Sequence, residues 1–146
     1  MIAPKTTPPT AREEAEAYEM LELRDGGLCQ RCRRGGEVQF DHRMNRSQGG
    51  WTAIENLQAL CGPEGVGGGC HLWKTEHPDL ANAAGWGVPG WAHWTWYPAR
   101  RWLRTPVNTH RLAWVLYIAD TWVEIDEQEA FTRRAGLLRT VPELVS

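Results

Sequence analysis

The sequence lacks any hydrophobic run that could cross a membrane. No apolar stretch approaches the roughly 18 residues that a spanning helix needs, which excludes a transmembrane protein and a membrane partner. The opening residues, MIAPKTTPPTAREE, also lack the apolar core of a secretory signal, so we expect a cytoplasmic protein. There is no internal repeat, and nine tryptophans in 146 residues exclude a collagen-like, coiled-coil or wholly disordered chain. We expect one compact domain with its own core.

A strong excess of charge of either sign is also missing. The formal net charge is −2, which argues weakly against nucleic acid as a partner. The distribution argues the other way, because residues 24–51 hold six arginines against three acids, and residues 95–111 hold four arginines and no acid. Two such segments could contact phosphates, or they could form ordinary solvated surface.

Local patterns predict a chain of mixed helices and short strands. A capping box from Thr10 to Glu13 marks the start of the first helix, and Gly26 allows its end. The helices expected are residues 11–24, residues 70–77 and a short helix from Pro78; the strands expected are residues 38–42, 113–118 and 121–125. Residues 54–60 fit a second strand or a helical turn, and residues 109–119 have a helix as the competing interpretation.

Composition divides the chain into three predicted segments. Residues 1–9 are expected to be a flexible N-terminus, residues 10–84 a helix followed by a cysteine- and histidine-rich core, and residues 85–146 a Trp-rich extension that packs on this core. Tryptophans beside arginines in the extension could stack on bases, but we favour the interpretation that they cover a core with few large apolar residues. The residues concerned are Trp91, Trp94, Trp96, Trp102, Arg100, Arg101 and Arg104. The last 20 or so residues could form a helix.

Four cysteines predict a metal site. They are Cys29, Cys32, Cys61 and Cys70, and clustered cysteines in a cytosolic protein more often bind metal or act in redox chemistry than form disulfides. Cys29 and Cys32 have zinc-knuckle spacing, whereas eight residues separate Cys61 from Cys70, more than the usual two to four. Five glycines in that loop would let its ends meet at one ion. We expect a structural Zn²⁺, with free core cysteines or a thiol redox pair as alternatives.

A carboxylate and two imidazoles accompany these cysteines. Asp41 and His42 lie between the two cysteine pairs, and His71 follows Cys70 directly. A carboxylate and an imidazole from separate elements suit Mg²⁺, Mn²⁺ or another divalent cation, and a histidine is a natural general base near neutral pH. Adjacent strand residues point to opposite faces, so Asp41 and His42 would share a target only through a twist or bulge at the strand end.

Six short elements, in order, resemble the HNH nucleases, and most closely their zinc-knuckle, phage-type members. They are Cys29-x2-Cys32, Phe40-Asp41-His42, Arg46-Ser47-Gln48-Gly49-Gly50, Glu55-Asn56-Leu57, Leu60-Cys61 and Cys70-His71. The resemblance covers residues 28–77 and implies a small α+β fold. In it, a ββα-metal core (a hairpin and a helix that hold one divalent cation) is stapled by the four-Cys zinc site, between the N-terminal helix and the Trp-rich extension.

The resemblance also implies roles for individual residues. His42 corresponds to the general base that activates water against a DNA phosphodiester, and Asp41 and His71 correspond to the two ligands of the catalytic cation. Asn56 corresponds to the asparagine that braces the hairpin loop and so orients His42. Thr75 stands where some members carry a third histidine ligand.

Three basic residues are predicted phosphate contacts. Arg43 and Arg46 flank the proposed base, and Lys74 would lie one helical turn from His71. We therefore expect a phage-encoded, divalent-metal-dependent DNA endonuclease in the cytoplasm of a bacterial host cell. A non-catalytic zinc-knuckle module that binds DNA or a protein, for instance in phage packaging, is the alternative. Because the net charge is −2, a protein partner is expected to help deliver the DNA.

Overall fold

A computed structural model of the chain describes residues 7–62 and 68–143. The helices are α1 (Ala11–Asp25), α2 (Gly69–Glu76), α3 (Pro78–Ala84) and α4 (Glu127–Arg134); the strands are β1 (Val38–His42), β2 (Leu57–Cys61), β3 (Ala99–Arg104), β4 (His110–Ile118) and β5 (Thr121–Ile125); the 3-10 turns are η1 (Arg46–Gln48) and η2 (Ile54–Asn56). Most of the predicted flexible N-terminus (residues 1–6) and much of the glycine-rich loop (residues 63–67) lie outside the described residues.

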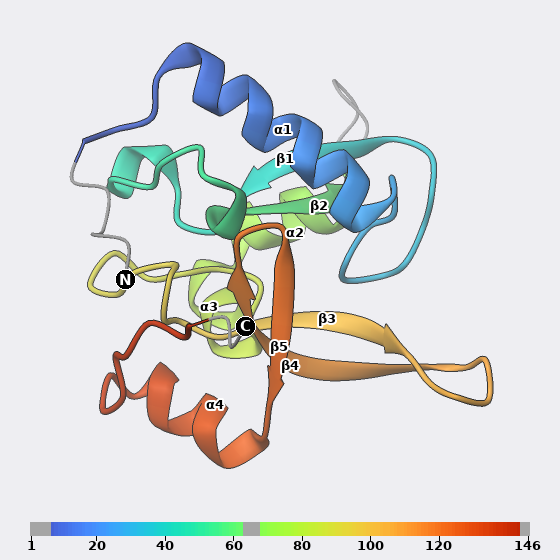
Figure 1. Cartoon of the computed structure of the whole chain (residues 1–146). Helices are drawn as coiled ribbons and strands as arrows, with labels where there is room; N and C mark the ends of the chain where they lie inside the picture. The colour runs from blue at the N-terminus through green and yellow to red at the C-terminus, as the bar shows by residue number, and fades with distance from the viewer. Residues whose placement is uncertain (1–6, 63–67, 144–146) are drawn as a thin grey trace.

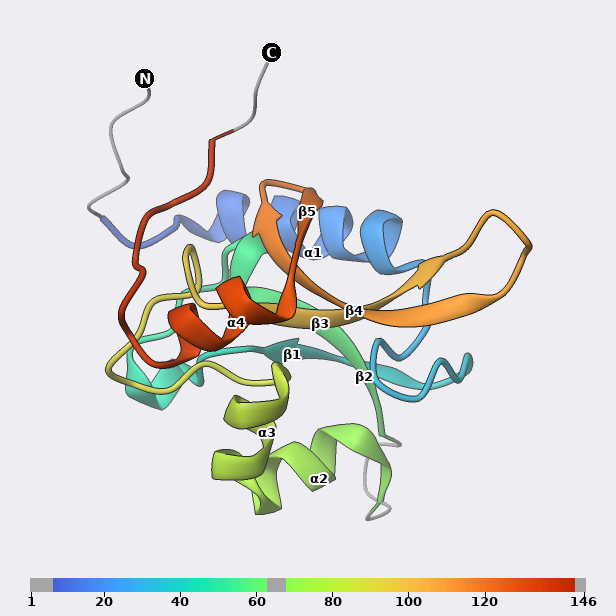
Figure 2. The same cartoon turned by 90° about the horizontal axis from the view of Figure 1, so that it is seen from below.

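A two-stranded hairpin lies between two helices. β1 and β2 pair antiparallel, with Val38 opposite Cys61 and His42 opposite Leu57. Helix α1 lies on one side of this hairpin and α2 on the other (Figures 1 and 2). Both predictions for residues 54–60 are confirmed in part, because a 3-10 turn comes first and the strand follows it. The predicted helices and strands of this half are therefore confirmed, and the fold is a small α+β fold.

The second sheet has the order β3-β4-β5, with both pairs antiparallel. The predicted β4–β5 hairpin is confirmed, and the helix considered for residues 109–119 is wrong. Strand β3 was not predicted, because its sequence ARRWLR has no simple alternation of apolar and polar residues. The C-terminal helix is shorter than the segment considered for it, and the boundary placed between residues 84 and 85 stays a prediction.

Tryptophans of the extension fill the core beside the first hairpin. Trp94 and Trp96 are buried in one cluster with Met44, Val88 and Tyr97. The interpretation that these aromatics cover the core is confirmed for Trp94 and Trp96. Trp91 differs, with 54% of its surface exposed.

The extension is attached to α1 by a buried ion pair. The Nη1 atom of Arg101 lies 3.1 Å from Oδ1 of Asp25, the last residue of α1, and both side chains are buried. Asp25 also accepts a hydrogen bond from the Ala59 amide in β2. One carboxylate therefore joins helix, hairpin and second sheet.

No helix among the described residues has the length and apolar character needed to span a bilayer.

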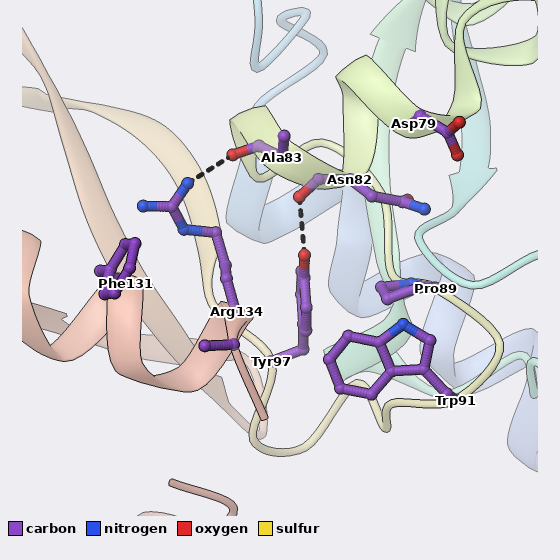
Figure 3. Close-up of a pocket in the computed structure, with 9 residues that line it drawn as sticks. Asp79, Asn82, Ala83, Pro89, Trp91, Tyr97, Phe131 and Arg134 are labelled. Atoms are coloured by element: carbon purple, nitrogen blue, oxygen red, sulfur yellow. Dashed lines mark hydrogen bonds between the residues drawn. The ribbon is translucent and has the colours of Figure 1, made fainter. Parts of the chain in front are cut away.

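Helix α4 packs near α3 beside a pocket of about 380 Å³ (Figure 3). Arg134 donates to the Ala83 carbonyl at 2.8 Å, and the Tyr97 hydroxyl donates to the Asn82 carbonyl at 2.8 Å. None of the site residues predicted from the sequence lines this pocket. The pocket belongs to the contact between α4 and α3.

Candidate metal centre and active site

The four cysteines meet at one point. Cys29 and Cys32 come from the turn after α1, Cys61 ends β2, and Cys70 lies in the first turn of α2; their Sγ atoms all lie within 4.8 Å of one another. Four thiolates about 2.3 Å from one tetrahedral zinc would stand about 3.8 Å apart. The cluster therefore suggests a structural metal such as zinc, and the wide gap between Cys61 and Cys70 is compatible with it.

Glycine at position 69 lets this gap close. Gly69 has φ +80°, and a Cβ there would lie 2.5 Å from the Cys61 carbonyl oxygen. A side chain would push the two ends of the loop apart. Close backbone approach therefore explains one of the five glycines that the sequence places in this loop.

The surroundings of the cluster favour a cation. Burial and the neighbouring thiols raise the pKa of Cys70 to about 12, so its proton leaves only where a cation takes its place, and the Arg31 guanidinium 3.4 Å from the Cys70 Sγ acts in the direction of the thiolate. Backbone amides of Cys32 and Cys70 donate to the Sγ atoms of Cys29 and Cys61. Such N–H···S bonds stabilise thiolates, and a divalent cation supplies the charge that four converging thiolates need. The donor set thus fits zinc.

A second group of side chains gathers on the α2 side of β1. Oδ1 of the buried Asp41 lies 3.0 Å from Nδ1 of His71, and its Oδ2 lies 3.2 Å from Nζ of Lys74. His71 and Lys74 are three residues apart on α2, which places both over the strand. The His71 side chain is 44% exposed, so solvent reaches the pair on that side.

Gln58, which the sequence reasoning missed, completes this group. It stands opposite Asp41 in the hairpin and is fully buried. Its Nε2 donates to Asp41 Oδ2 at 2.9 Å and to the Trp86 carbonyl at 2.6 Å, while its Oε1 has no hydrogen-bond partner among the described residues. The strand register, once known, would have identified it. An unpartnered buried acceptor beside a carboxylate is available to a water molecule or a cation.

His42 is the last residue of β1, and its ring turns away from this group. Its Nε2 lies 2.8 Å from the Thr52 hydroxyl oxygen. The register from Val38 to His42 has no bulge, so Asp41 and His42 leave the strand on opposite sides. Partial burial, followed by the charge of Arg46, lowers the His42 pKa below its ordinary value of 6.5. The lowered pKa favours the neutral ring, which is the form that accepts a proton.

Asn56 braces the loop that follows β1. Its Oδ1 accepts from the Met44 amide at 2.8 Å, and its Nδ2 donates to the carbonyls of Met44 and Trp51. The side chain is fully buried. These bonds tie both ends of the loop over residues 44–51, which begins two residues after His42.

Two of the three predicted phosphate contacts are engaged inside the protein. Arg43 is 1% exposed, and its guanidinium donates to the carbonyls of Glu55, Trp94 and Tyr97. The Lys74 ammonium is also buried, and besides Asp41 it contacts the His42 carbonyl and Asn45 Oδ1. We therefore correct both assignments, because neither group reaches the surface with a free donor.

Arg46 alone of the three is exposed. Its Nη2 lies 3.4 Å from Oε2 of Glu14 on α1.

Thr75 and His77 lie further along the chain than His71. Thr75 donates its hydroxyl to the His71 carbonyl, and His77 bonds the Trp73 carbonyl through Nδ1. Neither adds a ligand beside Asp41.

Residues 29–63 match the model of a protein family described as HNH endonuclease. The match spans the β1–β2 hairpin and contains Asp41, His42 and Asn56, while Cys70 and His71 follow it. No curated protein and no solved structure matches the chain. The resemblance to HNH nucleases is confirmed over this segment, and the match suggests a nuclease-type or nucleic-acid-related function.

Proposed function

We propose that this protein is a divalent-metal-dependent endonuclease that hydrolyses DNA phosphodiester bonds. One observation supports this above the others. A buried carboxylate oxygen of Asp41 lies 3.0 Å from an imidazole nitrogen of His71, and Asp41 directly precedes His42 in the segment that matches the HNH family.

The donor set fits a catalytic cation. Asp41 Oδ1 and His71 Nδ1 share a hydrogen bond 3.0 Å long, and two adjacent ligands about 2.1 Å from one octahedral ion would also stand about 3.0 Å apart, so a cation could take the place of the proton between them. A carboxylate and an imidazole leave the other positions to water and to phosphate oxygens. When bound, such a cation would supply electrostatic stabilisation of the charge that develops as the phosphodiester bond breaks.

The chain's own residues would prepare the attacking water. If Nε2 of His42 donates its hydrogen to the Thr52 hydroxyl, Nδ1 is the free acceptor that takes a proton from water. Lys74 fixes the His42 carbonyl from the α2 side, and Asn56 fixes the loop beyond it. His42 is then a general base whose backbone is held from two directions.

Plasmid cleavage tests this function. Wild-type protein with stoichiometric zinc should nick supercoiled plasmid in Mg²⁺ or Mn²⁺, and Asp41→Asn or His71→Ala should reduce the rate at least a hundredfold at unchanged zinc content. Thr75→Ala is the matched control on α2, because its hydroxyl bonds only the His71 carbonyl. Full activity in both ligand variants would contradict the proposal.

A non-catalytic binding module is the second candidate, and two contacts favour it. Lys74 already compensates the charge of Asp41, and Thr52 already occupies one nitrogen of His42. This module would bind DNA and zinc but cleave nothing with any divalent cation. The plasmid assay separates the two candidates. The phage origin, the host-cell location and the protein partner stay predictions.

A further inference from the structure

Arg33 and His110 meet although 77 positions separate them. Nη2 of Arg33, in the turn that carries the first cysteine pair, lies 3.3 Å from Nε2 of His110, the first residue of β4. Nearby, Nε1 of Trp102 in β3 donates to the Arg31 carbonyl at 3.0 Å. The β3–β4 hairpin projects from the body of the molecule (Figures 1 and 2). These two contacts place it beside the turn that carries Cys29 and Cys32.

This meeting gathers positive charge at the surface. We call the exposed residues Arg33, Arg34, Arg104 and His110 the knuckle–hairpin patch. Arg104 stands opposite His110 in the strand register and donates to Asn108. Within residues 7–62 and 68–143, none of its three arginines forms an ion pair with a carboxylate.

Most other arginines of the two basic segments pair with a carboxylate, whereas Arg31 bonds the Cys70 sulfur and Arg43 bonds backbone carbonyls. Arg101 pairs with Asp25, Arg100 with Glu127, and Arg111 with Glu124. Among the described residues, the exposed arginines of the two basic segments that have no carboxylate partner are therefore those of the patch. Desolvation, followed by the charges of Arg33 and Arg104, lowers the His110 pKa, so the patch takes its charge from arginine.

The backbone of Arg33 gives an independent indication. It has φ +67°, in the left-handed region that favours glycine. The turn needs this conformation, since the Arg33 amide donates to the Cys29 carbonyl at 2.8 Å, but it does not need the side chain. An arginine carries a conformational cost here that a glycine would avoid, and its contacts with His110 and, at 5.9 Å, with the Trp102 ring hold the guanidinium at the surface of the patch.

We propose that the knuckle–hairpin patch binds the phosphate backbone of duplex DNA away from the cleavage site. This inference rests on the proposed function and adds a second contact to it. Guanidinium groups bind phosphate oxygens through paired hydrogen bonds, and these contacts position a duplex without reading its sequence. The patch adjoins the cysteine end of the β1–β2 hairpin, and His42 lies at the other end.

The length of β1 sets the scale of this arrangement. Four steps along the strand from Val38 to His42 cover about 13 Å. Phosphates of one DNA strand follow one another by about 3.4 Å along the helix axis. About four base pairs span the length of this strand, so a duplex of two helical turns is much longer than the hairpin.

Salt-dependent DNA binding tests the inference separately from catalysis. The 146-residue chain, loaded with zinc and without added magnesium, would be titrated with a labelled duplex of about 20 base pairs, roughly two helical turns, over a series of salt concentrations. The variant Arg33→Ala/Arg104→Ala should bind more weakly. Its plot of log K against log salt has a negative slope that should become less steep by about 1.8. Arg33→Lys/Arg104→Lys should retain most of the slope. Arg12→Ala, in the first turn of α1, is the control for the loss of one exposed charge.

Each outcome decides the matter. If the alanine variant keeps the wild-type slope with its zinc content intact, or if wild-type protein binds no duplex, the inference is wrong. If the alanine variant loses slope and the lysine variant does not, the patch binds phosphate. Binding that depends on the patch, in a protein that never cleaves, would leave the inference standing and remove the nuclease.

Discussion

Nδ1 of His71 and Oδ1 of Asp41 lie 3.0 Å apart, although 30 residues separate them along the chain. The cysteine cluster accounts for this proximity. Cys70 in the first turn of α2 joins Cys61 at the end of β2, which sets α2 against the hairpin. The next residue of the helix, His71, then stands over Asp41. A structural metal at the cysteines would therefore position the ligands of the second site.

Removal of one cysteine should release the structural metal. Cys32→Ser should lower the zinc content from about one ion per chain to near zero, because four ligands complete a structural zinc site and three do not hold it as tightly. The Tm should fall with it. Elemental analysis and thermal unfolding check this. Full zinc content in the variant would contradict the four-cysteine site, and a reversible disulfide between Cys29 and Cys32 with no zinc would favour the redox alternative.

Lys74→Met should separate stability from cation binding. The free energy of unfolding should fall by about 3 kcal/mol, because the buried carboxylate of Asp41 loses its charge partner. Affinity for Mn²⁺ should rise at least several-fold, since a positive charge next to the site has been removed. Denaturant unfolding and Mn²⁺ titration measure the two effects. Unchanged Mn²⁺ affinity would argue that the cation does not bind at Asp41.

Asn56→Ala should destabilise the loop that follows β1. It leaves the Met44 amide and the carbonyls of Met44 and Trp51 without their partner, at a cost of about 3 kcal/mol. Cleavage should fall even where the variant is fully folded, because the segment after His42 is no longer held. Unfolding and single-turnover cleavage below the transition midpoint give the two numbers. Full activity in the folded variant would show that the brace serves stability alone.

Arg43→Met should act on stability and not on DNA. Loss of the guanidinium removes the partner of two buried carbonyls and of the partly buried Glu55 carbonyl, so the free energy of unfolding should fall by about 3 kcal/mol. The salt slope of DNA binding should stay at the wild-type value. A fall in that slope by about one would instead restore Arg43 as a phosphate contact.

Local signals explain what the sequence predicts well. The capping box at Thr10 and the alternation over residues 38–42 gave the first helix and β1 with bounds that the structure matches within a residue. The cysteine spacing likewise indicated a cluster that the structure assembles. Each signal lies within a few residues of the element it specifies.

Long-range contacts explain what it predicts poorly. Arg43 beside His42 resembles a surface phosphate contact, yet two of its acceptors, the carbonyls of Trp94 and Tyr97, come from more than 50 residues further along. Gln58 gains its place only through the strand register. Strand β3 is specified by pairing with β4 more than by its own pattern. Such partners are not visible until the chain has folded.

Single-turnover cleavage by His42→Ala tests the central claim most directly. Zinc-loaded wild-type and variant protein would be compared on a labelled DNA duplex in saturating Mg²⁺ or Mn²⁺. His77→Ala is the control, since His77 lies at the end of α2, stacked on Trp73 and outside the proposed machinery. We predict that His42→Ala cleaves at least a hundredfold more slowly at unchanged DNA affinity and zinc content, and that His77→Ala cleaves at the wild-type rate. Equal cleavage rates in wild type and His42→Ala would contradict the account.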